Sequence, residues 1–324
     1  MLDTIKPLII DRLKLQDAVA GEKLQTLWSG YGEIRRWEVK GAEFKSVVVK
    51  CIRKEASAKH PRGWNTERSH KRKIKSYEIE KYWYANYAAS LNAVVTVPRC
   101  YNVIETELFD LLVIEDLDAS GYPKRINEAS VEAVKTVLKW LATFHAFNLQ
   151  TEPIGLWQEG SYWHLNTRPD EYKKMEEGQL KKYAYAIDET LNTAKYRTLI
   201  HGDAKVANFC FNDQLNQVAA VDFQYVGGGC GMRDVSYFLG SCLSPEDCFR
   251  YEEELLKHYF NELTKALIEF NINININHIE KEWRALYPLA TADFVRFLKG
   301  WMPQHQKINN YSLKAVNKAI MQLL

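Results

Sequence analysis

The chain of 324 residues lacks the features of several large classes of protein. No apolar run is long enough to cross a bilayer, and the N-terminal segment MLDTIKPLIIDRL is interrupted by Asp11 and Arg12. A transmembrane helix needs about 20 apolar residues, and a signal peptide needs a longer apolar region and a small-residue cleavage site. We therefore expect a cytoplasmic protein with no membrane partner.

The chain also lacks a large excess of positive or negative charge, and it lacks closely paired cysteines. The net charge is only +2, which does not favour nucleic acid or an anionic membrane as a partner. The six cysteines form no C-x-x-C pair, and no histidine completes a zinc-type spacing. We expect reduced thiols, most of them buried, and no zinc site.

Hydrophobic residues make up 46% and charged residues 26% of the chain, as in a folded globular protein. Strand-like runs are predicted in the first third at residues 24–28, 34–39, 46–52, 94–104 and 108–114, with one helix at 73–90. After residues 115–123 the pattern becomes helical, at residues 130–148, 172–191, 245–270, 279–300 and 312–324. The sequence therefore predicts an α+β, two-lobed protein. Residues 1–117 would form an N-lobe with a small antiparallel sheet, and residues 118–324 a mostly helical C-lobe.

The segment that carries most chemical information is LIHGDAKVANFCF, followed after a short gap by VAAVDFQ. Asp203 follows an apolar run and a glycine, Asn208 lies five residues later, and Asp222 ends a second apolar run. One carboxylate can accept a proton from an attacking hydroxyl, while an amide oxygen and a second carboxylate can bind Mg²⁺. The segment therefore predicts a phosphoryl-transfer site to which Asp203, Asn208 and Asp222 supply these groups. Lys205 is predicted to be catalytic, because it could reach the phosphoryl group during transfer and offset its negative charge. The alternative is an ordinary hairpin with polar turn residues.

A second candidate feature is Lys50, inside the β-branched run SVVVKCI. A lysine in a buried strand is costly unless its charge is paired. Glu80, on the helix predicted at 73–90, is the expected partner, and Lys50 would then face nucleotide phosphates. Glu78 is the alternative partner, because a shift of one residue turns a helical side chain by about 100°. Otherwise Lys50 is an edge-strand residue that faces solvent.

Two backbone segments are candidates for nucleotide contacts. Ser29, Gly30 and Gly32 belong to an SGYG turn whose amides could cover phosphates, unless the glycines only form a hairpin. Glu115 and Leu117 end an apolar strand and could offer one carbonyl and one amide to adenine, unless they form a plain linker.

The remaining features have more than one interpretation. The basic run Lys59–Lys75 is a solvated loop or folds over an anionic ligand, and the alternating run Asn271–Asn277 is interpreted as a surface connection. His145 is expected to be structural, and Asp234 to tie down the loop that carries Asp203. The aromatic residues in 157–164 and 301–311 either bind an acceptor or form core.

The motifs HGDAKVAN, VDFQ and RDVSYFLG resemble those of the aminoglycoside phosphotransferase and choline kinase-like superfamily. They are most similar to its ecdysteroid kinase-like branch, and the resemblance runs from Ser29 to about Leu243. It implies the protein-kinase-like two-lobed fold, with ATP and Mg²⁺ as cofactors. By this resemblance Asp203 would be the catalytic base, and Asn208 and Asp222 the Mg²⁺ ligands. Lys50 and Glu80 would be the ion pair that holds the phosphates, and Glu115 and Leu117 would contact adenine.

Three departures from related kinases are informative. Gln224 stands where protein kinases have a glycine after D-F, and Lys205 stands where many antibiotic phosphotransferases have histidine. The A-P-E motif that ends a protein-kinase activation loop is missing, which favours a small-molecule acceptor. We expect ATP- and Mg²⁺-dependent phosphorylation of a small-molecule alcohol, such as a steroid-like compound or an amino alcohol. The alternatives are a nucleotide-binding regulatory protein without turnover and a protein kinase.

Overall fold

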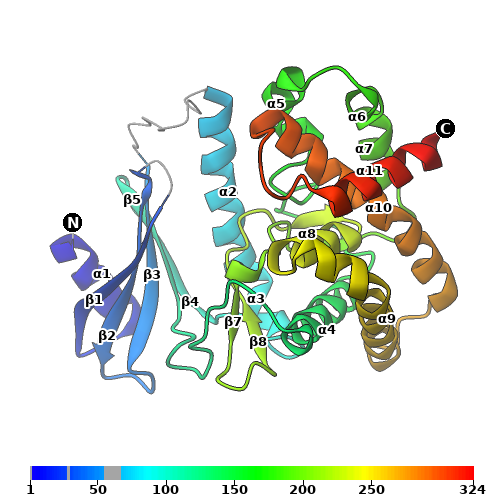
Figure 1. The fold of residues 1–324 in the computed structure, drawn as a ribbon. Coiled ribbons are helices and arrows are strands. Elements are labelled where there is room, and N and C mark those ends of the chain that lie inside the picture. Colours follow the sequence, from blue (N-terminus) through cyan, green and yellow to red (C-terminus); the bar gives the residue numbers. More distant parts are fainter. Residues whose placement is uncertain (1, 28–29, 55–66) are drawn as a thin grey trace. The chain divides into compact units, whose positions relative to one another are not determined.

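The computed structural model describes residues 2–27, 30–54 and 67–324. By its internal contacts the chain divides into two compact units (Figure 1). The first contains Met1–Lys124, Cys210–Gln214 and Ala219–Val221; the second contains Arg125–Phe209, Leu215–Val218 and Asp222–Leu324. The first unit is built on an antiparallel sheet and the second is mostly helical, so the predicted α+β fold class is confirmed.

The sheet of the first unit has five strands in the order β1-β2-β3-β5-β4, and all neighbours are antiparallel. The strands are β1 (Asp17–Thr26), β2 (Gly32–Lys40), β3 (Ser46–Arg53), β4 (Cys100–Glu105) and β5 (Phe109–Glu115). β4 is shorter than predicted, because residues 97–99, which include Pro98, lie outside the sheet. Proline cannot donate a backbone hydrogen bond to a neighbouring strand.

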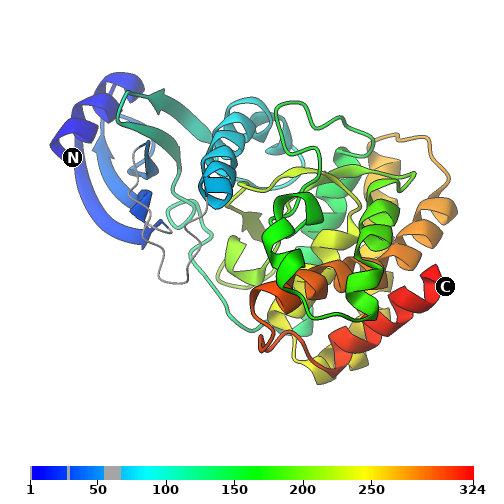
Figure 2. The ribbon, with the colours of Figure 1, turned by 90° about the horizontal axis from the view of Figure 1, so that it is seen from above.

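The side chains of strand β3 alternate between the two faces of this sheet. Val49 and Cys51 pack against helix α1 (Leu2–Leu13), which the sequence reasoning did not predict. Lys50 and Ile52 point to the other face, toward helix α2 (Glu67–Asn86). This alternation follows from the two-residue period of a strand. Figures 1 and 2 show the two helices on opposite sides of the sheet. The short helix α3 (Ala88–Leu91) follows α2.

The second unit is a packed set of helices. They are α4 (Val131–Phe147), α5 (Pro169–Lys174), α6 (Gln179–Lys182), α7 (Ala184–Asn192), α8 (Met232–Cys242), α9 (Pro245–Glu269), α10 (Ile276–Trp301) and α11 (Asn310–Leu323). Ser130 caps α4, since its side chain accepts a hydrogen bond from the Ala133 amide. Asn275 caps α10 in the same way, so the last residues of the run Asn271–Asn277 form the beginning of this helix.

One predicted helix, at residues 172–191, is wrong, because the structure divides this segment among α5, α6 and α7. Met175 is extended, with φ −62° and ψ 140°, which ends α5. Gly178, with φ 164° and ψ 177°, is also extended and precedes α6. The apolar spacing continues through these interruptions, so periodicity alone did not reveal them.

Four short strands surround the segment that was singled out in the sequence. β6 (Thr198–Ile200) pairs antiparallel with β9 (Gly227–Gly229), and β7 (Phe209–Phe211) pairs with β8 (Val218–Ala220). All four strands are buried. The polar residues that follow these strands in the sequence are therefore attached to buried, apolar segments.

Candidate active site

The loop that follows β6 depends on one glycine. Gly202 has φ +76°, and a Cβ atom at this position would lie 2.1 Å from the carbonyl oxygen of Tyr225. Only glycine combines this left-handed backbone with so close an approach. The loop then continues through Asp203 and Lys205 into a 3₁₀ turn at Val206–Asn208.

Asp234 on α8 fixes the backbone of this loop, as the sequence indicated. Its carboxylate accepts hydrogen bonds from the amides of His201 (2.6 Å) and Gly202 (2.9 Å). It is also bonded to Nε2 of His145 at 3.2 Å, and His145 is bonded through Nδ1 to the Tyr259 hydroxyl at 2.8 Å. Asp234 and His145 are fully buried. Charged acceptors form strong hydrogen bonds when buried, so this arrangement immobilises the backbone that leads into Asp203.

Asp203 has two oxygens in different environments. Oδ2 accepts hydrogen bonds from Lys205 Nζ (2.9 Å) and Asn208 Nδ2 (3.1 Å), and Nδ2 also donates to the Asp203 carbonyl at 2.8 Å. Oδ1 is buried and makes no close hydrogen bond with the described residues, although the Tyr237 hydroxyl lies near the carboxylate. A buried carboxylate oxygen without a donor is a costly feature unless a ligand uses it. The geometry therefore leaves one oxygen able to accept a proton.

Lys205 lies within the field of two carboxylates. Burial acts to lower its pKa, but the negative charges of Asp203 and Asp222 outweigh burial, so the pKa is raised above its ordinary value. Lys205 is therefore a cation at neutral pH, placed beside the unpaired oxygen of Asp203. A fixed positive charge at this place can stabilise negative charge that develops on a transferring group.

Asp222 is held in an unusual conformation. Its φ is +69°, a region that aspartate enters more readily than most residues. Nε2 of Gln224 donates to Asp222 Oδ1 at 2.5 Å. From the sequence, Gln224 was only a departure from the kinase pattern, and nothing in its position predicted a contact with Asp222.

The donor atoms of Asn208 and Asp222 fit a hard cation such as Mg²⁺. Asn208 uses its amide nitrogen on Asp203, which leaves its amide oxygen unused by the described residues. Mg²⁺ takes one or two protein oxygens and completes its shell with phosphates and water. Within residues 2–27, 30–54 and 67–324, no group of three or more His, Cys, Asp or Glu side chains could hold a metal ion. The chemistry of the donor set therefore rests on the amide oxygen of Asn208 and the carboxylate of Asp222.

In the first unit, Lys50 pairs with Glu80. Lys50 Nζ lies 2.6 Å from Glu80 Oε2, and the two side chains are only 5% and 3% exposed. Lys50 also lies over the Tyr77 ring, 5.4 Å from its centroid. Glu78, the alternative partner, is exposed on the other side of α2.

The glycine turn is described only in part, and Ser29 lies outside the described residues. Gly32 is required by the sheet, since a Cβ atom there would lie 1.9 Å from the Cys51 carbonyl oxygen. Gly30 has φ +74° and has no atom within 4 Å of its Cβ position. Packing therefore explains Gly32, whereas only the left-handed turn explains Gly30.

The segment after β5 is held by contacts that the sequence did not reveal. Arg36 donates to both oxygens of Asp116, from Nε at 2.7 Å and from Nη2 at 3.3 Å. The Leu117 carbonyl accepts from the Tyr122 amide at 2.8 Å, and no described residue accepts from the Leu117 amide. The Glu115 carboxylate accepts from the Ser120 hydroxyl at 2.7 Å. Leu117 itself is buried.

Aromatic residues surround Asp203. The hydroxyls of Tyr162 and Tyr237 lie 3.2 Å apart, and burial, followed by the charge of Asp203, raises the pKa of Tyr162. Trp157 and Trp163 are buried, so these members of the aromatic stretch belong to the core. Sequence reasoning missed Tyr237 and Lys307, which lie close to Asp203 but come from distant parts of the chain.

The fold and this loop define a phosphotransferase of the kinase-like class. The ecdysteroid kinase-like family model matches residues 38–154 and 157–272, so the chain belongs to the ecdysteroid kinase-like family. The recognition from sequence is thereby confirmed, and the family identifies the chain as a small-molecule kinase. No curated protein matches the chain. None of the helices in the described ranges is both long and apolar enough to span a membrane.

Solved structures of low sequence identity share the fold. Choline kinase LicA from Streptococcus pneumoniae is 14% identical, with a TM-score of 0.51 over 100% of this chain and 98% of its own. An ethanolamine kinase from Plasmodium vivax is 12% identical, with a TM-score of 0.50 over 91% of this chain and 81% of its own. An aminoglycoside-3'-phosphotransferase of type VIII is 16% identical, with a TM-score of 0.50 over 89% and 97%. At these identities the likeness establishes the fold.

Proposed function

We propose that the protein transfers the γ-phosphoryl group of ATP to a hydroxyl group of a small molecule, with Mg²⁺ as cofactor. The observation that carries this proposal is the asymmetry of Asp203. One oxygen is bound by Lys205 and Asn208, while the other is buried and makes no close hydrogen bond with the described residues. An alcohol that donates to Oδ1 would satisfy this oxygen and would be oriented for attack.

In the proposed reaction, Asp203 accepts the proton of the acceptor hydroxyl while that oxygen attacks the γ-phosphorus of ATP. The bond to the β–γ bridging oxygen breaks and ADP leaves. Lys205 offsets the negative charge on the transferred group. Asn208 and Asp222 would hold Mg²⁺, which neutralises charge on the phosphates when it is bound.

We further propose separate roles for the two parts of the chain. Residues 1–117 would bind the nucleotide, with Lys50, oriented by Glu80, on its phosphates. Ser29, Gly30 and Gly32 would cover the phosphates, and Glu115 and Leu117 would contact the adenine edge. Residues 118–324 would supply catalysis and the acceptor site. The Leu117 amide, from which no described residue accepts a hydrogen bond, supports the adenine contact.

The test is ATP-dependent phosphorylation of a panel of hydroxylated metabolites, with product detected by mass spectrometry. Asp203→Asn keeps the shape of the side chain but removes the base, so kcat should fall by about 10² to 10⁴. Asp213→Asn is the control, because Asp213 is exposed and pairs only loosely with Lys124, at 3.5 Å. Equal turnover by Asp203→Asn and wild type would refute the assignment of the base.

The same assay separates the two alternative functions. A regulatory protein would bind Mg·ATP, seen as a rise in thermal stability, but would form no product with any acceptor. A protein kinase would transfer labelled phosphate to protein and not to the metabolites.

A further inference from the structure

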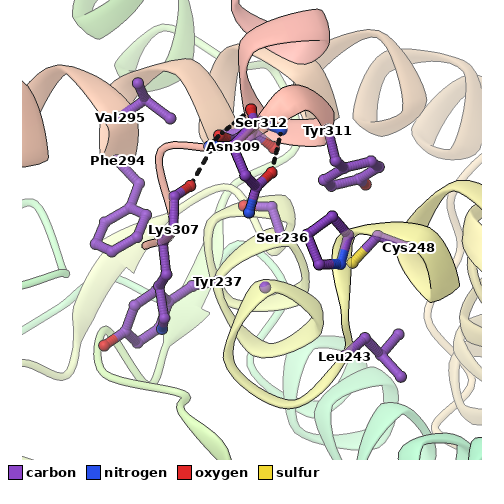
Figure 3. Close-up of a pocket in the computed structure, with 13 residues that line it drawn as sticks. Ser236, Tyr237, Leu243, Cys248, Phe294, Val295, Lys307, Asn309, Tyr311 and Ser312 are labelled. Carbon is purple, nitrogen blue, oxygen red and sulfur yellow. Dashed lines mark hydrogen bonds between the residues drawn. The ribbon is translucent and has the colours of Figure 1, made fainter. Parts of the chain in front are cut away.

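Lys307 is a cation for which the proposed reaction has no role. It lies between α10, which ends at Trp301, and α11, which begins at Asn310. Its carbonyl accepts a hydrogen bond from the Ser312 hydroxyl at 2.8 Å (Figure 3). Its amide donates to His305 Nδ1 at 3.1 Å. Both backbone polar groups of Lys307 are thus hydrogen-bonded, which fixes the position of its Cα atom.

The ammonium of Lys307 lies among aromatic rings instead of carboxylates. Nζ is 4.8 Å from the centroid of Tyr237 and 5.6 Å from that of Phe294. In the described part of the chain, no acidic side chain forms an ion pair with it and Nζ makes no hydrogen bond. Cation–π contacts compensate only part of the hydration that a buried ammonium loses. Burial accordingly lowers the pKa of Lys307 to about 8.

Lys307 belongs to the same cluster as the proposed base. The charges that act on it are those of Asp203, Lys205 and Cys242, and Lys307 in turn helps to lower the pKa of His305, after burial. Tyr237 connects the two groups, since its ring lies under Lys307 and the charge of Asp203 acts on its hydroxyl. A ligand that donates to Asp203 Oδ1 is therefore close to an unpaired cation.

A cavity beside this cluster does not provide the missing partner. Its volume is about 40 Å³, and its walls include Tyr237, Phe294 and Lys307 (Figure 3). This is room for about one water molecule. Polar groups on its walls are already bonded, as with Thr291 to the Tyr287 carbonyl at 3.2 Å. Among the described residues, the walls of this cavity thus offer no carboxylate to Lys307.

We propose that Lys307 recognises an anionic group, such as a carboxylate, sulfate or phosphate, on the acceptor whose hydroxyl is phosphorylated. The inference rests on the proposed function. The rings of Tyr237 and Phe294 would contact the hydrocarbon part between the anion and the hydroxyl. A charge-assisted hydrogen bond from a desolvated lysine gives strong selectivity for an anion over a neutral group of similar shape.

The test compares hydroxylated carboxylic acids with their methyl esters as acceptors. Wild type should prefer the acids, and Lys307→Met should lose about 10- to 100-fold in kcat/KM for the acids only. KM for ATP should not change, and Lys307→Arg should retain most of the preference. Lys314→Met is the matched control, because Lys314 is also a lysine over an aromatic ring, 5.2 Å from the centroid of Phe249, but is exposed.

Two outcomes would overturn the inference. The first is an equal loss for acids and esters in Lys307→Met, which would assign Lys307 to the transferred phosphoryl group. The second is an equal preference in wild type and Lys307→Met. If no acceptor in the panel is phosphorylated, binding decides the question. The lysines are methylated reductively with ¹³C-formaldehyde, and the Lys307 resonance is assigned as the NMR signal that is absent from Lys307→Met. If no acid raises the pH midpoint at which the Lys307 resonance titrates, the inference fails.

Failure of the proposed function would be recognised separately. In that case Asp203→Asn would not affect any turnover, whatever the result at Lys307. A response of the Lys307 resonance to acids but not to esters would then still establish an anion site in this cluster.

Discussion

Replacing Asp234 by asparagine tests whether a buried carboxylate holds the catalytic loop. The carboxylate accepts from the amides of His201 and Gly202, at 2.6 and 2.9 Å, and is bonded to His145. An asparagine has one acceptor oxygen, so its NH₂ group must face a donor of the loop. The loss of a hydrogen bond to a charged acceptor costs about 1.5–3 kcal/mol, and a buried N–H without an acceptor costs about 1–3 kcal/mol more.

We therefore expect Asp234→Asn to lose about 3–5 kcal/mol of unfolding free energy, measured by urea denaturation. If the variant remains folded, kcat should fall more than KM for ATP rises, because the displaced residue is the proposed base Asp203 and not a proposed nucleotide contact. Asp213→Asn, at an exposed position, should stay within about 0.5 kcal/mol of wild type. A loss below 1 kcal/mol together with normal kcat would refute the role given to Asp234.

Three further predictions concern stability. Glu80→Gln removes the carboxylate charge that lies 2.6 Å from buried Lys50, and it should cost about 3–5 kcal/mol of unfolding free energy in urea denaturation. Exposed Glu78→Gln should cost less than about 0.5 kcal/mol, and equal losses would contradict the buried pair. Gly202→Ala combines a strained φ with a backbone clash and should cost about 3 kcal/mol or more, while Gly240→Ala, which meets no atom within 4 Å, should be neutral or stabilising. Burial lowers the pKa of Lys307 to about 8 from 10.5, so its charge destabilises the fold most below pH 8, and the effect fades as the pH rises toward 10.5. The unfolding free energy of Lys307→Met should therefore exceed that of wild type by about 1–3 kcal/mol at pH 7 and by little near pH 10. Denaturation measured at a series of pH values would show this.

The fold could be predicted in outline because its elements follow local rules. The β-branched run at Ser46–Arg53 became β3, and Ser130 caps α4 through its side chain. Helix α1 was missed because Pro7 lies within it and its apolar residues were considered only as a possible targeting segment. The break between α5 and α7 was missed because it depends on two extended residues, Met175 and Gly178, that leave the apolar spacing unchanged.

The candidate site also contains residues that the sequence predicts and residues that it does not. Asp203, Lys205 and Asn208 lie within six residues, so a short loop brings them together and the sequence displays the whole set. The pair of Lys50 and Glu80 was also predictable, because strand and helix periodicities each leave few choices for the inward side chain. The contact of Gln224 with Asp222 was not, since it needs the positive φ of Asp222.

The residues that would choose the acceptor are the hardest to find from sequence. Lys307 and Asp203 are about one hundred residues apart, and they approach only because Tyr237 on α8 packs between them and the loop before α11 is anchored by Ser312. No local pattern marks a lysine whose environment is set by rings from two other segments. In this fold, then, the reaction can be predicted from short motifs, whereas the acceptor must be inferred from cations and rings that the three-dimensional structure brings together.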